Sequence, residues 1–136
     1  MTDTNPTVRE FMTPFPHTIG IDQSLAKAEK MMLEHGVQHL PVLAGGKLVG
    51  ILSDRDIKLV ESFRDVDPEK TMVAEAFTPD PYVVSPNDFL AEVCREMEAH
   101  HYGSALVCEG EKLVGIFTWI DALRALNQVL AGPVTA

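Results

Sequence analysis

The stretch GKLVGILSDRDI, residues 46–57, sets the architecture of this chain, because the stretch EKLVGIFTWIDA, residues 111–122, repeats its pattern 65 positions later. Each stretch is an apolar segment that ends at a small hydroxyl residue, with an aspartate three positions further on. The same shift, applied without gaps, also aligns prolines, helix-face residues and histidines elsewhere in the chain. A repeat of this length indicates that one supersecondary unit is built twice.

The first copy is predicted to have the order β-α-β-β-α. Asp22 or Ser24 can cap its first helix, and Gly36 follows the last turn, where a residue that tolerates positive φ is favoured. The Ala44-Gly45-Gly46 turn predicts an antiparallel hairpin, and Ser53 can open the final helix. The predicted elements are an extended segment at 16–21, a helix that ends near 35, strands at 39–43 and 47–52, and a helix through 63.

The second copy repeats this order, and a short linker helix is expected between the copies. Asp67 and Pro68 provide the cap and the first position of that linker helix. The predicted elements of the second copy are a strand at 82–84, a helix from about Asn87 to His100, strands at 104–108 and 112–117, and a helix from Thr118 to about Leu130 that Gly132-Pro133 ends. The expected organisation is a first repeat at 7–65, a linker at 66–76 and a second repeat at 77–131, packed into one integrated α+β unit.

Composition limits the classes of function. The chain has 136 residues with 11 basic and 20 acidic side chains, a net charge of −9, which argues against binding to nucleic acid or to an anionic membrane. The sequence shows no secretory signal and no apolar run near the roughly 18 residues that cross a bilayer, so a cytoplasmic location is expected. Cys94 and Cys108 are expected to be buried apolar residues rather than a disulfide or zinc site.

Two segments, Ser53 to Asp56 and Thr118 to Asp121, could carry chemistry. Each has the spacing of a capping box, in which hydroxyl and carboxylate satisfy free backbone N–H groups at a helix start. The same groups could bind a nucleotide, with the helix start and hydroxyl on a phosphate and the carboxylate on a ribose diol. Arg55 could add a cation toward phosphate, whereas its counterpart Ile120 cannot.

The doubled pattern resembles a tandem pair of cystathionine β-synthase-type (CBS) domains, which carry two β-α-β-β-α units that each end in G-h-h-[ST]-x-x-D, where h is apolar. The match runs from about residue 7 to residue 130. It includes VREFMTP before the first repeat, MVAEAFTP before the second, and GVQHLPVL within the first. The resemblance implies an α/β sandwich in which the two repeats pack with pseudo-twofold symmetry.

The resemblance also implies a regulatory role without catalysis or a catalytic cofactor. Family members bind AMP, ADP or ATP, and in some cases S-adenosylmethionine or an NAD-type molecule, in two clefts between the repeats. A homodimer and a regulated protein on another chain are likewise implied. Carried onto this sequence, one cleft would hold Thr18, Ile19, Gln38 and His39 with Thr118 and Asp121, and the other Val83, Val84, Gly103 and Ser104 with Ser53, Arg55 and Asp56.

The sequence departs from the family pattern at two places, and it also leaves an alternative to nucleotide binding. Trp119 could stack on a ligand or crowd its cleft, and Ala105-Leu106 replaces the Leu-Pro found at Leu40-Pro41. His35 and His100 are explained by helix ends, and a metal site is not expected. His39 could either assist a phosphate as a partly charged imidazole or be a packed strand histidine, and no set of catalytic residues can be assigned. The alternative function is an interaction module that only dimerises and docks a partner, with empty or vestigial clefts.

Overall fold

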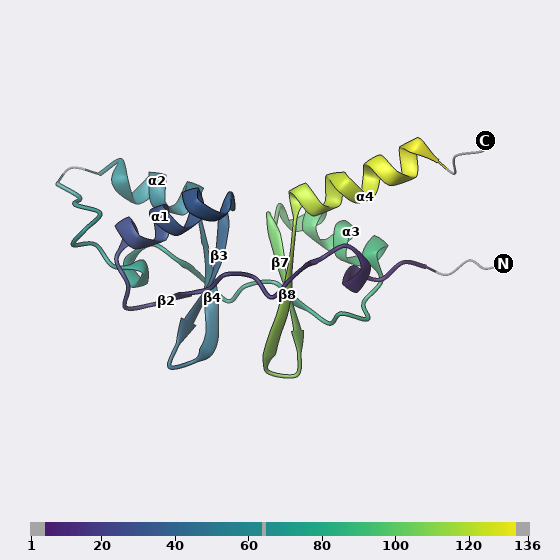
Figure 1. Ribbon diagram of the computed structural model, residues 1–136, viewed down its shortest axis with the longest axis horizontal. Helices are drawn as coiled ribbons and strands as arrows, with labels where there is room; N and C mark the ends of the chain where they lie inside the picture. Colours follow the sequence, from purple (N-terminus) through teal and green to yellow (C-terminus); the bar gives the residue numbers. More distant parts are fainter. Residues whose placement is uncertain (1–4, 64, 133–136) are drawn as a thin grey trace. The chain divides into compact units, whose positions relative to one another are not determined.

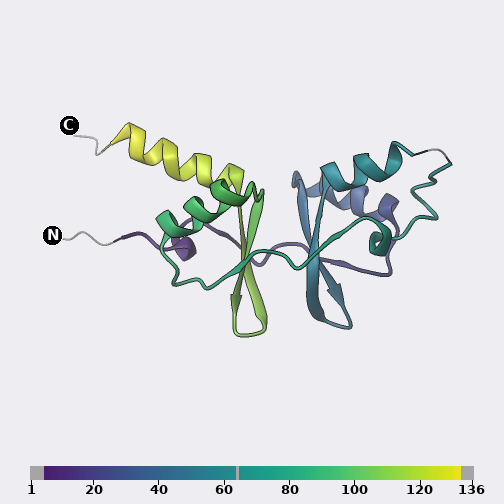
Figure 2. The same cartoon turned by 180° about the vertical axis from the view of Figure 1, so that it is seen from behind.

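The computed structural model describes residues 5–63 and 65–132, which divide into two compact units. The first-repeat unit is Pro16–Pro81, and the second-repeat unit consists of the described parts of Met1–Phe15 and Tyr82–Ala136. Each unit contains one four-stranded sheet with two α-helices on one of its faces (Figures 1 and 2). The α+β fold class expected from the repeat is confirmed.

The first-repeat unit has the strand order β2-β3-β4-β5. The short strand β2 runs parallel to β3, and the β3–β4 hairpin is antiparallel. Strand β5 adds to the free edge of β4 in antiparallel orientation. The elements are β2 (Ile19–Gly20), α1 (Leu25–His35), β3 (His39–Ala44), β4 (Lys47–Ser53), α2 (Asp54–Glu61), the 3-10 helix η2 (Val73–Glu75) and β5 (Thr78–Pro79).

The second-repeat unit has the equivalent order β1-β8-β7-β6, with the same parallel and antiparallel pairings. The 3-10 helix and the edge strand come last in the chain order of the first-repeat unit, whereas in the second-repeat unit they lie before its other elements, near the start of the chain. The elements are the 3-10 helix η1 (Val8–Glu10), β1 (Thr13–Pro14), β6 (Val83–Val84), α3 (Leu90–His100), β7 (Ser104–Glu109), β8 (Lys112–Thr118) and α4 (Trp119–Ala131).

Local signals in the sequence account for most of these boundaries. The Ser24 side chain accepts a hydrogen bond from the Lys27 N–H at 3.1 Å and caps α1, which ends at Gly36 in the left-handed conformation. The hairpin turn places Gly45 and Gly46 at φ values of 58° and 81°, which side chains rarely adopt. The predicted hairpin and the predicted caps of α1 are therefore confirmed.

Two predicted helices differ from the structure. Helix α3 begins at Leu90, three residues later than expected, because Asp88 instead accepts the Ser85 N–H at 2.9 Å in a turn. The linker forms no α-helix. Asp67 caps only a single turn by accepting the Glu69 N–H, and the 3-10 helix follows because Val73 is fully buried in the core of the first-repeat unit.

The edge strands show that each unit takes its edge strand from the start of the other repeat. Strand β1 lies at the start of the first repeat but pairs with β8, and β5 lies at the start of the second repeat but pairs with β4. The compact units therefore follow a different division of the chain from the sequence repeats expected at 7–65 and 77–131.

This crossing explains the glycine shared by the two KLVGI stretches. A Cβ atom at Gly50 would collide with the Phe77 ring and the Thr78 carbonyl oxygen, and one at Gly115 with the Met12 sulfur. At each of these glycines, the crossing segment lies directly against the strand, in the space that a side chain would otherwise fill. Close approach of two backbones is a common reason for a glycine within a strand.

Each unit has its own apolar core between its sheet and its helices. In the first-repeat unit the core joins α1, α2, the sheet and η2. In the second-repeat unit it joins α3, α4, the sheet and η1, with Phe117 as the largest fully buried side chain. None of the helices within 5–63 and 65–132 is both long enough and apolar enough to span a bilayer.

Candidate functional site

The predicted ligand residues gather, within each unit, where the hairpin meets the following helix. In the first-repeat unit His39 lies opposite Ser53, and the first N–H of α2, from Asp54, donates to the Gln38 carbonyl oxygen at 3.0 Å. In the second-repeat unit Ser104 lies opposite Thr118. The equivalent bond there joins the Trp119 N–H to the Gly103 carbonyl oxygen at 3.2 Å. The sequence assigned these residues to two clefts that each combine residues of both repeats; the structure brings together, within each unit, the members that belong to that unit.

Ser53 and Asp56 form a complete capping box at the start of α2. The Ser53 hydroxyl oxygen accepts the Asp56 N–H, and one Asp56 carboxylate oxygen accepts the Ser53 N–H, both at 3.0 Å. A third group that the sequence did not assign, the Thr78 hydroxyl, lies 3.3 and 3.4 Å from the two carboxylate oxygens. The carboxylate thus caps the helix and also fastens β5 to it.

Asp121 holds the equivalent position at the start of α4 and is only 3% exposed. Its carboxylate accepts the Thr118 N–H at 3.0 Å and the Thr118 hydroxyl at 3.4 Å. The Thr13 hydroxyl donates to the other oxygen at 3.3 Å, and Arg124 forms an ion pair with that oxygen. Thr13 and Arg124, like Thr78, were not singled out as site residues, although the sequence repeats Thr13 at Thr78.

Two basic residues, Arg55 and His39, lie near Asp56. Arg55 is exposed on the first turn of α2. Burial lowers the pKa of His39, against the opposing effect of the Asp54 and Asp56 carboxylates, and Arg55 lowers it further. The imidazole is therefore mostly neutral at pH 7 and can offer one donor and one acceptor. The lowered pKa favours the packed, neutral strand histidine over a partly charged His39 that assists a phosphate, the two alternatives that the sequence left open.

The remaining predicted residues, on the short strands, differ in what they can present. The side chains of Ile19 and Val84 are buried in the two cores, so only their backbones can face a ligand. Val83 is exposed and Thr18 half-buried. Among these strand residues, Val83 is the one whose apolar side chain is exposed.

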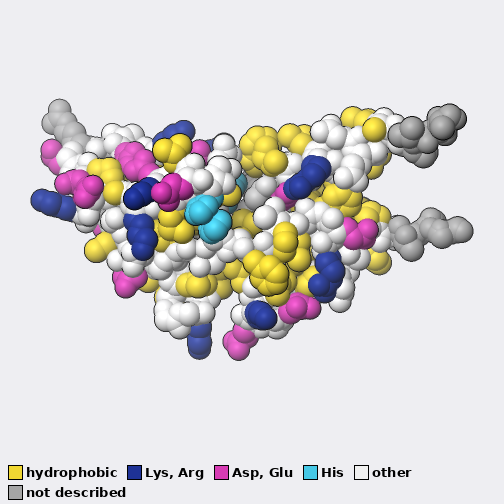
Figure 3. Space-filling model, in the orientation of Figure 1, with side chains coloured by type: hydrophobic (Ala, Val, Ile, Leu, Met, Phe, Trp, Pro, Cys, Tyr) yellow, Lys and Arg dark blue, Asp and Glu magenta, His cyan; other side chains and the backbone are white. Residues whose placement is uncertain are grey.

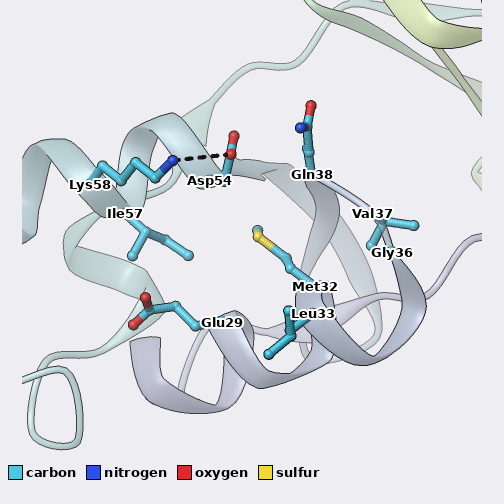
Figure 4. Close-up of a pocket in the computed structure, with 9 residues that line it drawn as sticks. All are labelled: Glu29, Met32, Leu33, Gly36, Val37, Gln38, Asp54, Ile57 and Lys58. Atoms are coloured by element: carbon cyan, nitrogen blue, oxygen red, sulfur yellow. Dashed lines mark ion pairs between the residues drawn. The ribbon is translucent and has the colours of Figure 1, made fainter.

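A pocket of about 390 Å³ opens between α1 and α2 of the first-repeat unit (Figure 4). Its floor is apolar, and the Asp54–Lys58 ion pair, at 3.7 Å, lies at its rim. Gln38 is the predicted ligand residue that it includes. The lining residues are Glu29, Met32, Leu33, Gly36, Val37, Gln38, Asp54, Ile57 and Lys58.

Glu29 in this pocket faces a second carboxyl group. Burial raises its pKa from the ordinary 4.5 to about 7, and Glu61 adds to the rise through a hydrogen bond and through charge repulsion. One Glu61 carboxylate oxygen is buried and has no hydrogen-bond partner among the described residues. The sequence gave no indication of this pair, because the residues are 32 positions apart on separate helices.

Three histidines stack on other rings, and the two cysteines are free thiols, with Cys94 half-buried and Cys108 buried. The His17 and His35 rings stack with centroids 3.6 Å apart, and the His100 ring stacks on Tyr102 at 5.1 Å. Burial raises the pKa of the Cys94 and Cys108 thiols. Across residues 5–63 and 65–132, no three or more histidine, cysteine or acidic side chains are grouped as metal ligands would be.

Helix α4 carries exposed apolar side chains along its length (Figure 3). Trp119, whose role the sequence left open, lies at its first position and is 45% exposed. The others are Ile120, Leu123, Leu126, Val129 and Leu130. A face of this kind on a protein surface is characteristic of an interaction site.

Known proteins are similar to this chain in sequence or in fold. Hypoxic response protein 1 of Mycobacterium tuberculosis is 31% identical over 123 residues, which cover 90% of this chain and 86% of that protein. An uncharacterized conserved protein from Pyrococcus horikoshii has a TM-score of 0.84 at 27% identity, with 99% and 100% of the two chains covered. CBSX2 in complex with AMP has a TM-score of 0.79 at 29% identity, with 90% and 97% covered.

The family model of the CBS domain matches this chain twice, at residues 8–61 and 73–128. These matches overlap the two repeats expected from the sequence pattern, although the second match begins within the segment expected as the linker; together they cover most of the chain. The chain therefore belongs to the CBS domain family and carries two CBS domains in tandem.

Proposed function

We propose that this protein is a regulatory module that binds an adenosine-containing ligand and passes its bound state to a partner protein. The observation that carries the proposal is the junction of β4 and α2, where a carboxylate, a hydroxyl, a guanidinium and a neutral imidazole surround one helix start. These groups belong to Asp56, Ser53, Arg55 and His39. The similarity to CBSX2, which binds AMP, supports the same choice of ligand.

Each group has a part in the proposed complex. The Asp56 carboxylate would accept hydrogen bonds from the two ribose hydroxyls, as acidic residues do in dinucleotide sites. The start of α2 and the Arg55 guanidinium would attract the phosphate. The neutral imidazole of His39 would offer a donor or an acceptor to the base or sugar. No group in this set is arranged as nucleophile and base, so the proposed role is binding without chemistry.

The finer parts of the proposal concern the nucleotide and the assembly. AMP, ADP and ATP share the adenine and ribose contacts, and S-adenosylmethionine or an NAD-type molecule would share them too. A response to the ratio of these nucleotides would make the protein an energy sensor. The proposed assembly is a homodimer that acts on another protein in the cytoplasm, and its mass can be measured by sedimentation velocity.

A thermal-melt panel tests the proposal directly. AMP, ADP, ATP, S-adenosylmethionine and NADH are added in turn, with ribose 5-phosphate and inorganic phosphate as controls that lack adenine. A ligand at a hundred times its dissociation constant stabilises the protein by about 2.7 kcal/mol, which is readily seen in the melting temperature. At least one adenosine compound is expected to raise it while both controls do not. A flat response to all five compounds would contradict the proposal.

The exposed apolar face of α4 favours a second candidate function, an interaction module that docks a protein without a ligand. Its side chains would lose contact with water in such a complex, which stabilises association. Leu126, exposed on α4, is a suitable place for the test substitution Leu126→Lys. If this second function is the main one, that variant abolishes self-association or partner binding, and the nucleotide panel gives no shift.

A further inference from the structure

We infer that the two CBS domains are not equivalent as nucleotide sites: the Asp56 carboxylate is open to a ribose diol, whereas the Asp121 carboxylate is closed by Arg124. This inference rests on the proposed function and names which of the two aspartates recognises the sugar. It follows from the hydrogen-bond partners that each carboxylate already has. A carboxylate offers about four lone-pair positions to donors.

The Asp121 carboxylate has all of these positions filled. One oxygen accepts the N–H and the hydroxyl of Thr118, and the other accepts the Thr13 hydroxyl and the Arg124 guanidinium. The side chain of Asp121 is only 4% exposed. A ribose diol could bind only by displacing donors from a buried carboxylate, and losing such charge-assisted bonds opposes binding.

The Asp56 carboxylate has about half of its positions free. Among the described residues, only the Ser53 N–H and the Thr78 hydroxyl donate to it. Asp56 is also half-buried rather than buried. Both donors hold the carboxylate in a fixed orientation, and two lone-pair positions remain for the two hydroxyls of a ribose. The carboxylate is therefore oriented in advance for a diol.

One residue difference accounts for the contrast. Arg124 lies three positions after Asp121, and the residue three positions after Asp56 is Leu59. Leucine has no donor, and Leu59 is 62% exposed. The two helix starts differ in the same sense. The first domain has the cationic Arg55 where the second domain has Ile120. The first domain thus has a cation placed for phosphate and none placed against its aspartate.

Exchange of this one residue is the test, because Leu59 is exposed and its replacement should leave the fold intact. Leu59→Arg is expected to close Asp56 and to weaken AMP binding by about tenfold or more in isothermal titration calorimetry. Leu59→Gln, the matched control without a cation, is expected to stay within about twofold of the wild-type affinity. Leu59→Arg should also remove the preference for AMP over its 2′,3′-dideoxy analogue, which lacks the diol.

The reciprocal variant Arg124→Leu supplies the second measurement. The wild-type protein is expected to bind one AMP per chain, and Arg124→Leu is expected to gain a second site. Equal AMP affinity in Leu59→Arg and Leu59→Gln would overturn the inference, and so would two equivalent sites in the wild type. If the wild type binds none of the five adenosine compounds, the proposed function itself fails, and this assignment fails with it.

Discussion

The Thr13 hydroxyl donates to the Asp121 carboxylate across 108 positions of the chain, at 3.3 Å, and the Thr78 hydroxyl makes the equivalent bond to Asp56. Each bond joins the segment that opens one repeat to the helix start that closes the other repeat's hairpin. The threonine of the repeated Thr-Pro pair is therefore a structural tether. It also positions the carboxylate on which the proposed nucleotide site depends.

Removal of either tether should lower stability. Thr13→Val and Thr78→Val keep the side-chain volume and remove the hydroxyl, and each is expected to lower the free energy of unfolding by about 0.5–1.5 kcal/mol. Thr13→Val should have the larger effect because Asp121 is buried. Urea unfolding measures both. The control is Thr7→Val, since the Thr7 hydroxyl makes only an exposed contact with Glu10 at 3.4 Å; losses no larger than in this control would contradict the tether.

The two strand glycines should tolerate no side chain. Gly50→Ala and Gly115→Ala place a methyl group against the crossing segments, at Phe77 and at Met12, and should each cost about 1–3 kcal/mol. Thermal unfolding measures the change. Gly20→Ala is the matched control, because its new methyl group would meet the movable end of the Asp22 side chain and would lie at an ordinary contact distance from Gln23. If all three variants have the same melting temperature, the crossing segments do not lie where the structure places them.

The Glu29–Glu61 pair should make stability fall as pH rises. The pKa of Glu29 is raised in the folded protein from 4.5 to about 7, so between these values the folded state binds the proton more tightly than the unfolded state. Its contribution is therefore fully present below pH 4.5 and is lost as pH rises through 7. Glu29→Gln removes this loss, so the variant should gain stability relative to wild type between pH 4.5 and 8.

Chemical denaturation at several pH values measures this difference. Glu61→Gln is the companion variant, because it removes the hydrogen bond and the repulsion that add to the pKa rise of Glu29. Its pH slope should lie between those of the wild type and Glu29→Gln. Parallel curves for the wild type and Glu29→Gln would show that Glu29 titrates alike in the folded and unfolded chain.

The sequence predicted most of the fold because its signals are local. Ser24, Gly36 and the Gly45-Gly46 turn act on their own neighbours, and the structure confirms each of them. The linker helix was wrong because tertiary burial of Val73 outweighs the cap at Asp67. The crossing of β1 and β5 could not be predicted, since Thr13-Pro14 and Thr78-Pro79 are alike and either hairpin could accept either segment.

The candidate site could be predicted in type but not in detail. The capping-box spacing identified Asp56 and Asp121 as a pair, and the contrast that the sequence predicted between the two helix starts was Arg55 against Ile120. Arg124 and its counterpart Leu59 can also be read from the sequence, but the ion pair of Arg124 with Asp121 cannot, because the spacing permits that contact and does not fix it. The pocket beside Glu29 depends on how α1 and α2 pack, and it leaves no pattern in the sequence.

Calorimetric titration of AMP into Asp56→Asn tests the central claim most directly, that the Asp56 carboxylate recognises the ribose of a bound nucleotide. Asparagine can still accept the Ser53 N–H, so the melting temperature should stay close to that of wild type. The affinity should fall by about tenfold or more, because the NH2 group that replaces one carboxylate oxygen cannot accept a hydroxyl and the negative charge is lost. Asp88→Asn, at an aspartate whose carboxylate likewise accepts a backbone N–H, is the matched control and should bind as wild type does. Wild-type affinity in Asp56→Asn would contradict the account.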